Sequence, residues 1–319
     1  ALGLVWFMVK LLEYFPGKSF WQITEETVGS YLGLIVMLAL FIPWLFSVSL
    51  TLRRFSEMII IVALPDTPIS IITLAFIGTS AFVAYLGIEA ISRSCFLAFP
   101  FILGALVFIM VLTGPSWKTD WLFPLLGKGL EPIMKNCLLH TSDFLEINLL
   151  LVLSNICFPN QIKKISVQSI LIATVIFFSS VLTYILTFPP LVGEEPYLPL
   201  YMMARSVYLG RFIQRIEAIF LFFWVFAGYL WMSTGVFGIC HITADTLKLP
   251  DYRPLILPTA IIITALSFIP ANLPDTVIWA NNFYFRIVSI SILAIPAMLL
   301  LAAKARGKGA KPGAKSKTS

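Results

Sequence analysis

HTSDFLEINLLLVLSNICF, residues 140–158, combines an apolar run of membrane-spanning quality with a polar beginning. Its first seven residues include a histidine, two hydroxyl groups and two carboxylates. Asp143 and Glu146 are three residues apart and therefore share one face of a helix. Ionisable groups are rare inside membrane spans and usually face a bundle interior or water. The stretch therefore predicts a membrane helix whose polar end has a function.

The composition of the whole chain supports a membrane location. Of 319 residues, 59% are hydrophobic and 12% charged, whereas an average soluble domain is about 25% charged. A membrane-spanning helix needs about 20 mostly apolar residues, and the runs found here are too continuous for barrel strands, which alternate. We therefore predict an all-α, polytopic membrane helix bundle. The expected spans lie near 1–15, 30–52, 68–86, 94–113, 137–158, 166–188, 216–240, 254–269 and 283–303.

Basic residues predict the orientation of the bundle and the nature of its C-terminal tail. Lys and Arg gather in one set of connections and in residues 304–319, which predicts a cytoplasmic C-terminus. Its Gly- and Lys-rich composition is typical of a disordered segment. The tail either contacts anionic lipid head groups or serves as a topology signal and solubilising end. No aromatic interleaving accompanies its charge, so nucleic acid is not an expected partner.

The sequence contains no recognisable catalytic constellation. Its two histidines, His140 and His241, are far apart, and there is neither a Gly-rich phosphate loop nor metal-ligand spacing. The four cysteines form no CxxC pair and indicate neither a disulfide framework nor a zinc site. We therefore expect no enzyme, no metal and no cofactor.

The segment Thr141-Ser142-Asp143 is a poor helix interior but a good N-cap. One interpretation is a helix broken inside the membrane, as in transporters whose half-helix ends face a ligand. The other is a cap at the membrane surface, at the start of a continuous span. In the first case Thr141, Ser142, Asp143 and Glu146 are the candidate ligand-binding residues.

Two pairs of opposite charges lie within or against other apolar runs. Arg54 and Glu57 are separated by three positions, and Glu89 and Arg93 by four, so either pair can form along one helix. The same groups have the alternative of contacting a ligand. We predict structural ion pairs at the interface for both.

Several motifs occur in an order that resembles a known family. They are FPGKS at 15–19 followed by WQITEETVG, Arg54-Phe55-x-Glu57 followed by Leu64-Pro65-x-Thr67-Pro68, Gly87-x-Glu89-x3-Arg93 followed by Pro100, Phe144-x-Glu146, and Arg215-x-Glu217 followed by Trp224. Together they resemble the B subunit of spore germinant receptors, the spore germination permease family. That family belongs to the amino acid–polyamine–organocation superfamily.

The resemblance implies a five-plus-five inverted-repeat fold of ten helices, whose first and sixth helices are broken at the midplane and cradle the ligand. Nine spans are expected here, so the first family helix is expected to be missing, and 137–158 corresponds to the sixth. Members often carry a Pro-Phe-Gly-Glu run at that break, whereas this chain has Asp143-Phe144-Leu145-Glu146. The break would then be held by side chains that bond to the backbone.

The resemblance also implies a function. The chain is expected to bind a small germinant, an amino acid, in the inner membrane of a bacterial spore. It would signal with receptor A and C subunits. The alternative is a proton- or cation-coupled amino-acid transporter of the same fold. Ser233 and Thr234 lie at a suitable depth to complete the pocket, or else serve as ordinary helix-packing residues.

Overall fold

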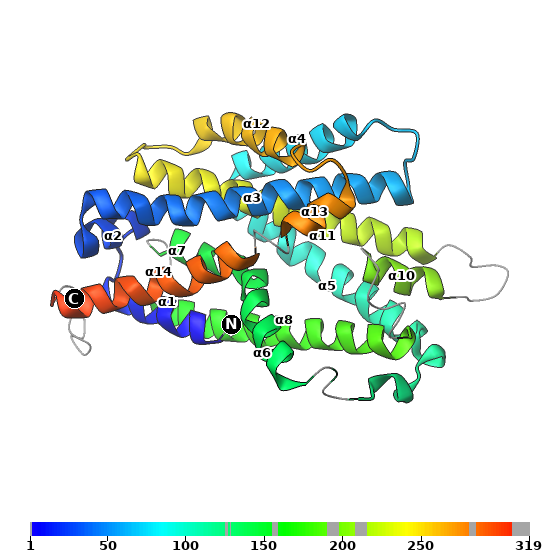
Figure 1. Ribbon diagram of the computed structural model, residues 1–319. Helices are drawn as coiled ribbons and strands as arrows, with labels where there is room; N and C mark the ends of the chain where they lie inside the picture. The colour runs from blue at the N-terminus through cyan, green and yellow to red at the C-terminus, as the bar shows by residue number, and fades with distance from the viewer. Residues whose placement is uncertain are drawn as a thin grey trace. The chain divides into compact units, whose positions relative to one another are not determined.

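The computed structural model describes residues 2–124, 127, 129–154, 159–189, 198–207, 216–280 and 285–307, and every regular element among them is a helix. Figure 1 shows their arrangement along the chain. The α-helices are α1 (Leu2–Tyr14), α2 (Phe20–Val28), α3 (Ser30–Val62), α4 (Ile69–Leu86), α5 (Ile88–Leu112), α6 (Leu130–Leu139), α7 (Leu149–Val152), α8 (Pro159–Thr187), α10 (Pro199–Ser206), α11 (Ile216–Thr246), α12 (Ile256–Ser267), α13 (Leu273–Trp279) and α14 (Phe285–Ala305). The 3₁₀ helices are η1 (Gly114–Ser116), η2 (Thr119–Leu122), η3 (His140–Asn148) and η4 (Arg253–Leu255).

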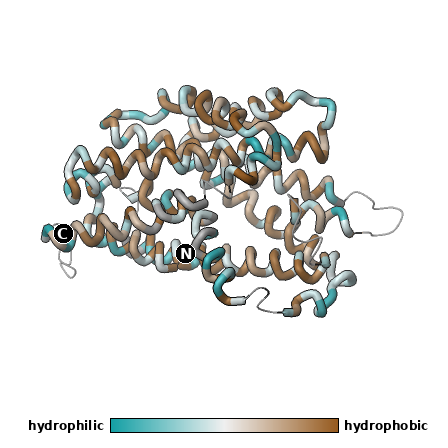
Figure 2. The backbone as a smooth tube through the Cα atoms, in the orientation of Figure 1, coloured by the Kyte–Doolittle hydropathy of each residue, from teal (hydrophilic) through white to brown (hydrophobic). Residues whose placement is uncertain are grey.

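Five helices in the described part of the chain are long and apolar enough to cross a membrane. They cover Ser30–Val62, Ile69–Leu86, Ile88–Ser116, Gln161–Thr187 and Glu217–Thr246. Figure 2 shows hydrophobic residues along these helices and hydrophilic ones concentrated at the turns. The predicted class, an all-α polytopic membrane bundle, is confirmed. The bilayer crossings at 1–15, 137–158, 254–269 and 283–303 stay predictions.

The chain divides into two compact units, each assembled from segments that are distant in sequence. The first comprises Ala1–Arg54, Asn136–Ile170 and Gly235–Ser319, and the second comprises Phe55–Lys135 and Leu171–Thr234. In the first unit α14 packs against α1, α2 and η3. In the second unit α5 packs against α4 and α10, around the buried side chains of Ile109, Met203, Ala204 and Phe220.

Glycines set two of the sharp boundaries between helices. Gly29, between α2 and α3, has φ 93°, and Gly87, between α4 and α5, has φ 96°. Residues with a Cβ rarely adopt such angles, so glycine is the residue that permits these reversals. Pro43 lies inside α3 without ending it, which neighbouring helices permit in membrane proteins.

The short amphipathic helix α2 is attached to the first unit by polar contacts at both of its ends. Ser19 and Gln22 form a capping box at its N-terminus. The backbone N–H of Trp21 also donates to Asp245 Oδ2 of α11 at 3.1 Å. At the other end, Arg306 Nη1 donates to the carbonyl oxygen of Thr27 at 2.7 Å. These contacts join three segments that are distant in sequence.

Glu25 adds a charged contact to this attachment. Its carboxylate accepts a hydrogen bond from Ser30 Oγ at 2.9 Å and lies 3.4 Å from Lys248 Nζ. The hydroxyl donor, and then the ammonium, hold the pKa of Glu25 below its usual value. A carboxylate with a lowered pKa contributes stability above its unfolded pKa and loses that contribution as the pH falls through the folded one. The attachment of α2 therefore weakens in acid.

Replacing Asp245 by Ala is expected to lower the free energy of unfolding by about 1 kcal/mol. The substitution removes a side-chain acceptor and a negative charge from the N-terminus of α2. The matched control is Asp251→Ala, because Asp251 is exposed and contacts Arg253 two residues away, accepting its backbone N–H at 3.1 Å and lying 3.7 Å from Nη1, and such exposed pairs contribute about 0–1 kcal/mol. Denaturation of the detergent-solubilised protein measures both, and equal losses would contradict the role given to Asp245.

The predicted tail begins inside regular structure. Lys304 and Ala305 belong to α14, and Arg306 contacts α2 as described. Residues 308–319 lie outside the described part of the chain, so the predicted disorder of 304–319 stays a prediction for them.

Candidate functional site

The stretch that contains the predicted site is not a continuous α-helix. The α-helix α6 ends at Leu139, η3 follows from His140 to Asn148, and α7 has only four residues. Within η3, Phe144 has φ −102° and ψ 25°, which is not helical. Such interruptions in a membrane protein occur where the backbone is buried in protein or lines a water-filled cavity, and 3₁₀ stretches within helices often mark functional hinges.

The hydroxyl of Thr141 bonds to the backbone of the preceding helix. Its Oγ1 donates to the carbonyl oxygen of Cys137 at 3.2 Å. This bond satisfies one of the carbonyl groups at the end of α6, which a helix C-terminus leaves without intrahelical partners. The backbone of Asp143 belongs to η3, but its side chain lies outside the described residues.

The 3₁₀ geometry determines which side chains face the protein. With three residues per turn, positions i and i+3 eclipse one another. Ser142, Leu145 and Asn148 follow this spacing, with the non-helical Phe144 between the first two, and they are 2%, 2% and 0% exposed. Glu146 is half-buried on a neighbouring face and has a polar contact there. Among the side chains of this segment that the structure describes, the buried polar ones are thus Ser142 and Asn148.

Asn148 is the residue of this segment that sequence reasoning missed. Its side chain is fully buried, and neither Oδ1 nor Nδ2 has a hydrogen-bond partner among the described residues. An amide buried without a partner costs about 1–3 kcal/mol, so such groups are rare in native proteins and need an explanation. The sequence contained one signal, an amide inside the otherwise apolar run from Ile147 to Leu153.

The surroundings of η3 come from the first unit. η3 packs against α14 and α7, which Figure 1 shows beside one another. After α7, Ser154 Oγ donates to the carbonyl oxygen of Lys18 at 3.1 Å and so ties the segment to the turn between α1 and α2. On α14, Ser289 is buried and has a polar contact.

Ser233 and Thr234 bond within their own helix. Ser233 Oγ donates to the carbonyl oxygen of Tyr229, and Thr234 Oγ1 to that of Leu230, each at 2.9 Å. Both residues belong to the second unit, whereas η3 belongs to the first. The bonds fit the helix-packing alternative, and a pocket that includes these two hydroxyls stays a prediction.

Of the two predicted ion pairs, the structure shows the one between Glu89 and Arg93 directly. Arg93 Nη2 lies 2.5 Å from Glu89 Oε1, with both side chains more than three-quarters exposed. Arg54 and Glu57 each have a polar contact, and their pairing with one another stays a prediction. Arg215, which begins the fifth motif, lies outside the described residues.

Arg53, rather than its neighbour, is the deeply buried arginine of α3. It is 6% exposed, and its Nη2 donates to the carbonyl oxygen of Ala271 at 2.7 Å. Its guanidinium carbon lies 5.5 Å from the ring centroid of Phe268, within the range of a cation–π interaction. Arg53 therefore joins α3 to the connection between α12 and α13 within the first unit.

Other features of the described residues bear on the chemistry. No group of three or more His, Cys, Asp or Glu side chains is placed there to hold a metal ion. Cys95, Cys137 and Cys240 are free thiols, and Cys157 lies outside the described part.

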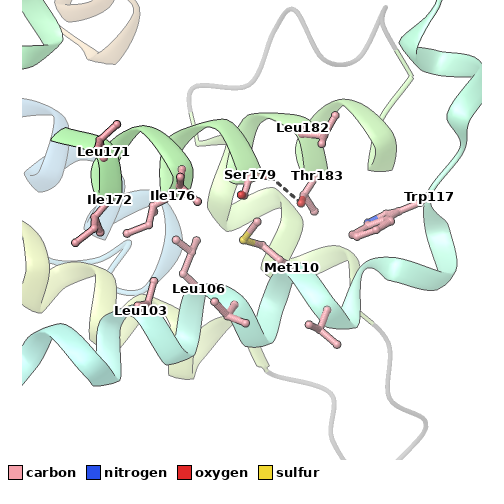
Figure 3. Close-up of a pocket in the computed structure, with 13 residues that line it drawn as sticks. Leu103, Leu106, Met110, Trp117, Leu171, Ile172, Ile176, Ser179, Leu182 and Thr183 are labelled. Carbon is pink, nitrogen blue, oxygen red and sulfur yellow. Dashed lines mark hydrogen bonds between the residues drawn. The ribbon is translucent and has the colours of Figure 1, made fainter. Parts of the chain in front are cut away.

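A cavity of about 730 Å³ lies between α5 and α8, but its lining is almost entirely apolar (Figure 3). Such a lining cannot satisfy a zwitterionic ligand.

These features define the class of the protein: a polytopic helical membrane protein with an interrupted helix that contains a buried amide unpaired among the described residues. The family model described as "Spore germination protein" matches residues 1–276. The chain therefore belongs to this family of spore germination proteins, and the resemblance seen in its motifs is confirmed.

Individual relatives support the same membership. The chain is 25% identical over 300 residues to Spore germination protein A2 of Bacillus subtilis (strain 168), an alignment that covers 90% of this chain and 79% of the relative. It is 22% identical over 278 residues to Spore germination protein KB of the same organism, covering 84% and 74%. It is also 22% identical over 241 residues to Spore germination protein XB of Bacillus anthracis, covering 75% and 66%.

Proposed function

We propose that this germination protein is the membrane subunit of a nutrient receptor in the spore inner membrane. It binds a small germinant, an amino acid, at the interrupted segment η3 and acts through partner A and C subunits rather than as an enzyme. The observation that carries the proposal is Asn148, a fully buried amide without a partner among the described residues, inside a kinked segment.

The chemistry of an amide suits an amino acid. The side chain of Asn148 offers two N–H donors and one carbonyl acceptor. The donors match a carboxylate, and the acceptor matches an ammonium group. Hydrogen bonds to charged groups contribute about 1.5–3 kcal/mol each. A zwitterion bound there would offset the cost of burying the amide.

The kink at Phe144 would allow η3 to change between two conformations. A ligand shifts an equilibrium only when it binds one conformation better than another. A segment held by 3₁₀ geometry and one non-helical residue has fewer favourable backbone bonds than an α-helix. Binding at Asn148 would stabilise one arrangement of η3 against α14, and the partner subunits would respond to that arrangement.

A coupled transporter is the second candidate, because interrupted helices are typical of transporter binding sites. In that case Glu146, half-buried on η3, is the coupling carboxylate. Fold alone does not distinguish a receptor from a transporter. The distinction lies in whether the substrate accumulates.

Uptake into proteoliposomes separates the two functions. Full-length protein, with and without a pH gradient, is incubated with each of the twenty radiolabelled amino acids. A receptor is expected to show saturable binding without accumulation. Gradient-driven accumulation that Glu146→Gln abolishes would instead establish the transporter and overturn the receptor. Absence of both binding and accumulation for all twenty would reject both.

A further inference from the structure

A long apolar groove lies in the second unit, separate from η3. Its volume is about 730 Å³, and α5 and α8 form its two walls. Figure 3 shows Leu103, Leu106 and Met110 on one side facing Leu171, Ile172 and Ile176 on the other, with Trp117 at one end. Both walls and this end of the groove belong to the second unit, so their positions relative to one another are defined.

The lining offers hydrocarbon and almost no hydrogen bonding. Thr183 Oγ1, one of its few polar atoms, already donates to the carbonyl oxygen of Ser179 at 2.8 Å. Val111 and Val175 remain 66% and 64% exposed. A polar occupant would lose its hydration without compensation here, whereas an alkyl chain would lose nothing.

The length of the groove matches one leaflet of a bilayer. Its wall on α8 runs from Leu171 to Thr183, which is about 18 Å at a rise of 1.5 Å per residue. Half of a hydrocarbon core of ~30 Å is about 15 Å. One acyl chain that lies along the helices therefore fills the groove from the middle of the membrane to its surface.

The end at Trp117 has the groups of a membrane–water interface. Trp117 Nε1 donates to Thr113 Oγ1 at 3.3 Å, and tryptophan is enriched at that depth. The backbone N–H of Lys118 donates to the carbonyl oxygen of Leu186 at 2.9 Å and joins this end of the groove to α8.

The charge at this end favours an anionic head group. Lys118 is exposed, and its Nζ lies 5.0 Å from the ring centroid of Trp121. Asp120 is close in sequence, but no carboxylate among the described residues pairs with Lys118. A lysine beside an apolar groove complements a lipid phosphate. We propose that this groove binds one acyl chain of an anionic phospholipid, whose phosphate lies at Lys118.

Native mass spectrometry of the full-length protein tests this proposal. The protein is released from nanodiscs of equal parts phosphatidylglycerol and phosphatidylcholine, and the lipid retained per chain is counted. The original protein is expected to retain one phosphatidylglycerol. Val175→Phe fills the groove and is expected to lower retention at least tenfold. Lys118→Gln is expected to keep a lipid but to lose the preference for phosphatidylglycerol.

The matched control is Val181→Phe, which makes the same change on α8 at a position outside the groove lining. It is expected to retain lipid like the original protein. The proposal is overturned if the original protein retains no lipid, or if Val175→Phe and Val181→Phe behave alike. It is also overturned if a partner subunit, crosslinked through Val175→Cys, displaces the lipid in the assembled receptor.

Discussion

Replacing Asn148 by Leu is expected to raise the germinant concentration for half-maximal response by about 10- to 100-fold, without destabilising the ligand-free protein. Asn148 is fully buried, and its amide has no partner among the described residues. Leu has the same branched shape without the polar atoms. Removing an unsatisfied amide by a shape-conserving change avoids a cost of about 1–3 kcal/mol. The free protein should therefore become equally or more stable.

The loss of response follows from the proposed site. One hydrogen bond to a charged ligand group contributes about 1.5–3 kcal/mol, and about 1.4 kcal/mol is a factor of ten in affinity. A change that stabilises the protein yet removes its response cannot act through misfolding. The two readouts are the melting temperature of the purified protein and the dose response of spores that carry the variant at the original protein level.

Ser80 provides the matched control for this substitution. It is also fully buried, and its Oγ has no partner among the described residues, but it lies in the second unit. Ser80→Ala removes that unpaired group and is expected to leave the dose response unchanged. If Asn148→Leu also leaves the dose response unchanged, Asn148 takes no part in germinant binding.

A second large effect is expected from Gly238→Ala. A Cβ on Gly238 of α11 would lie 2.3 Å from Cη2 and 2.6 Å from Cζ2 of Trp44. Trp44 is 1% exposed, so its indole cannot move aside into solvent. Small residues allow membrane helices to approach closely, and overpacking typically costs about 1–3 kcal/mol or more. We expect a loss of at least about 3 kcal/mol, with little folded protein recovered.

The control for this prediction is Gly104→Ala on α5, where an added Cβ meets no atom within 4 Å. There the same substitution is expected to stabilise the helix by about 0.5–1 kcal/mol, since glycine is a poor helix former. Monodispersity after size exclusion and the melting temperature in detergent measure both variants. Similar behaviour of the two alanine variants would contradict the close approach of α11 to Trp44.

Much of the helical architecture could be predicted from sequence, because long apolar runs leave the backbone few alternatives to helix in a membrane. The span expected near 30–52 lies within α3, which begins at Ser30 and ends at Val62. The spans expected near 68–86 and 94–113 correspond to α4 and α5, which Gly87 separates. In both cases the local sequence was sufficient to predict the helix.

The candidate site depends on packing and was only partly predictable. The polar stretch at 141–143 was compatible with a broken helix or with a cap at the membrane surface, and the non-helical residue is Phe144. The period of an α-helix pairs Asp143 with Glu146 on one face. The 3₁₀ period keeps these two positions together as well, and the side chains that are buried are those of Ser142, Leu145 and Asn148. Which residue of a kinked segment becomes buried depends on its contacts with α14, which follows much later in the chain, and no local pattern contains that information.

The most direct test is equilibrium binding of radiolabelled L-amino acids to the full-length protein in nanodiscs, compared with its Asn148→Leu variant. At least one amino acid is expected to saturate the original protein at one molecule per chain. The variant, equally folded by its melting temperature, should bind that amino acid at least tenfold more weakly. Equal affinity in the two proteins would contradict the assignment of the germinant site to the buried face of η3.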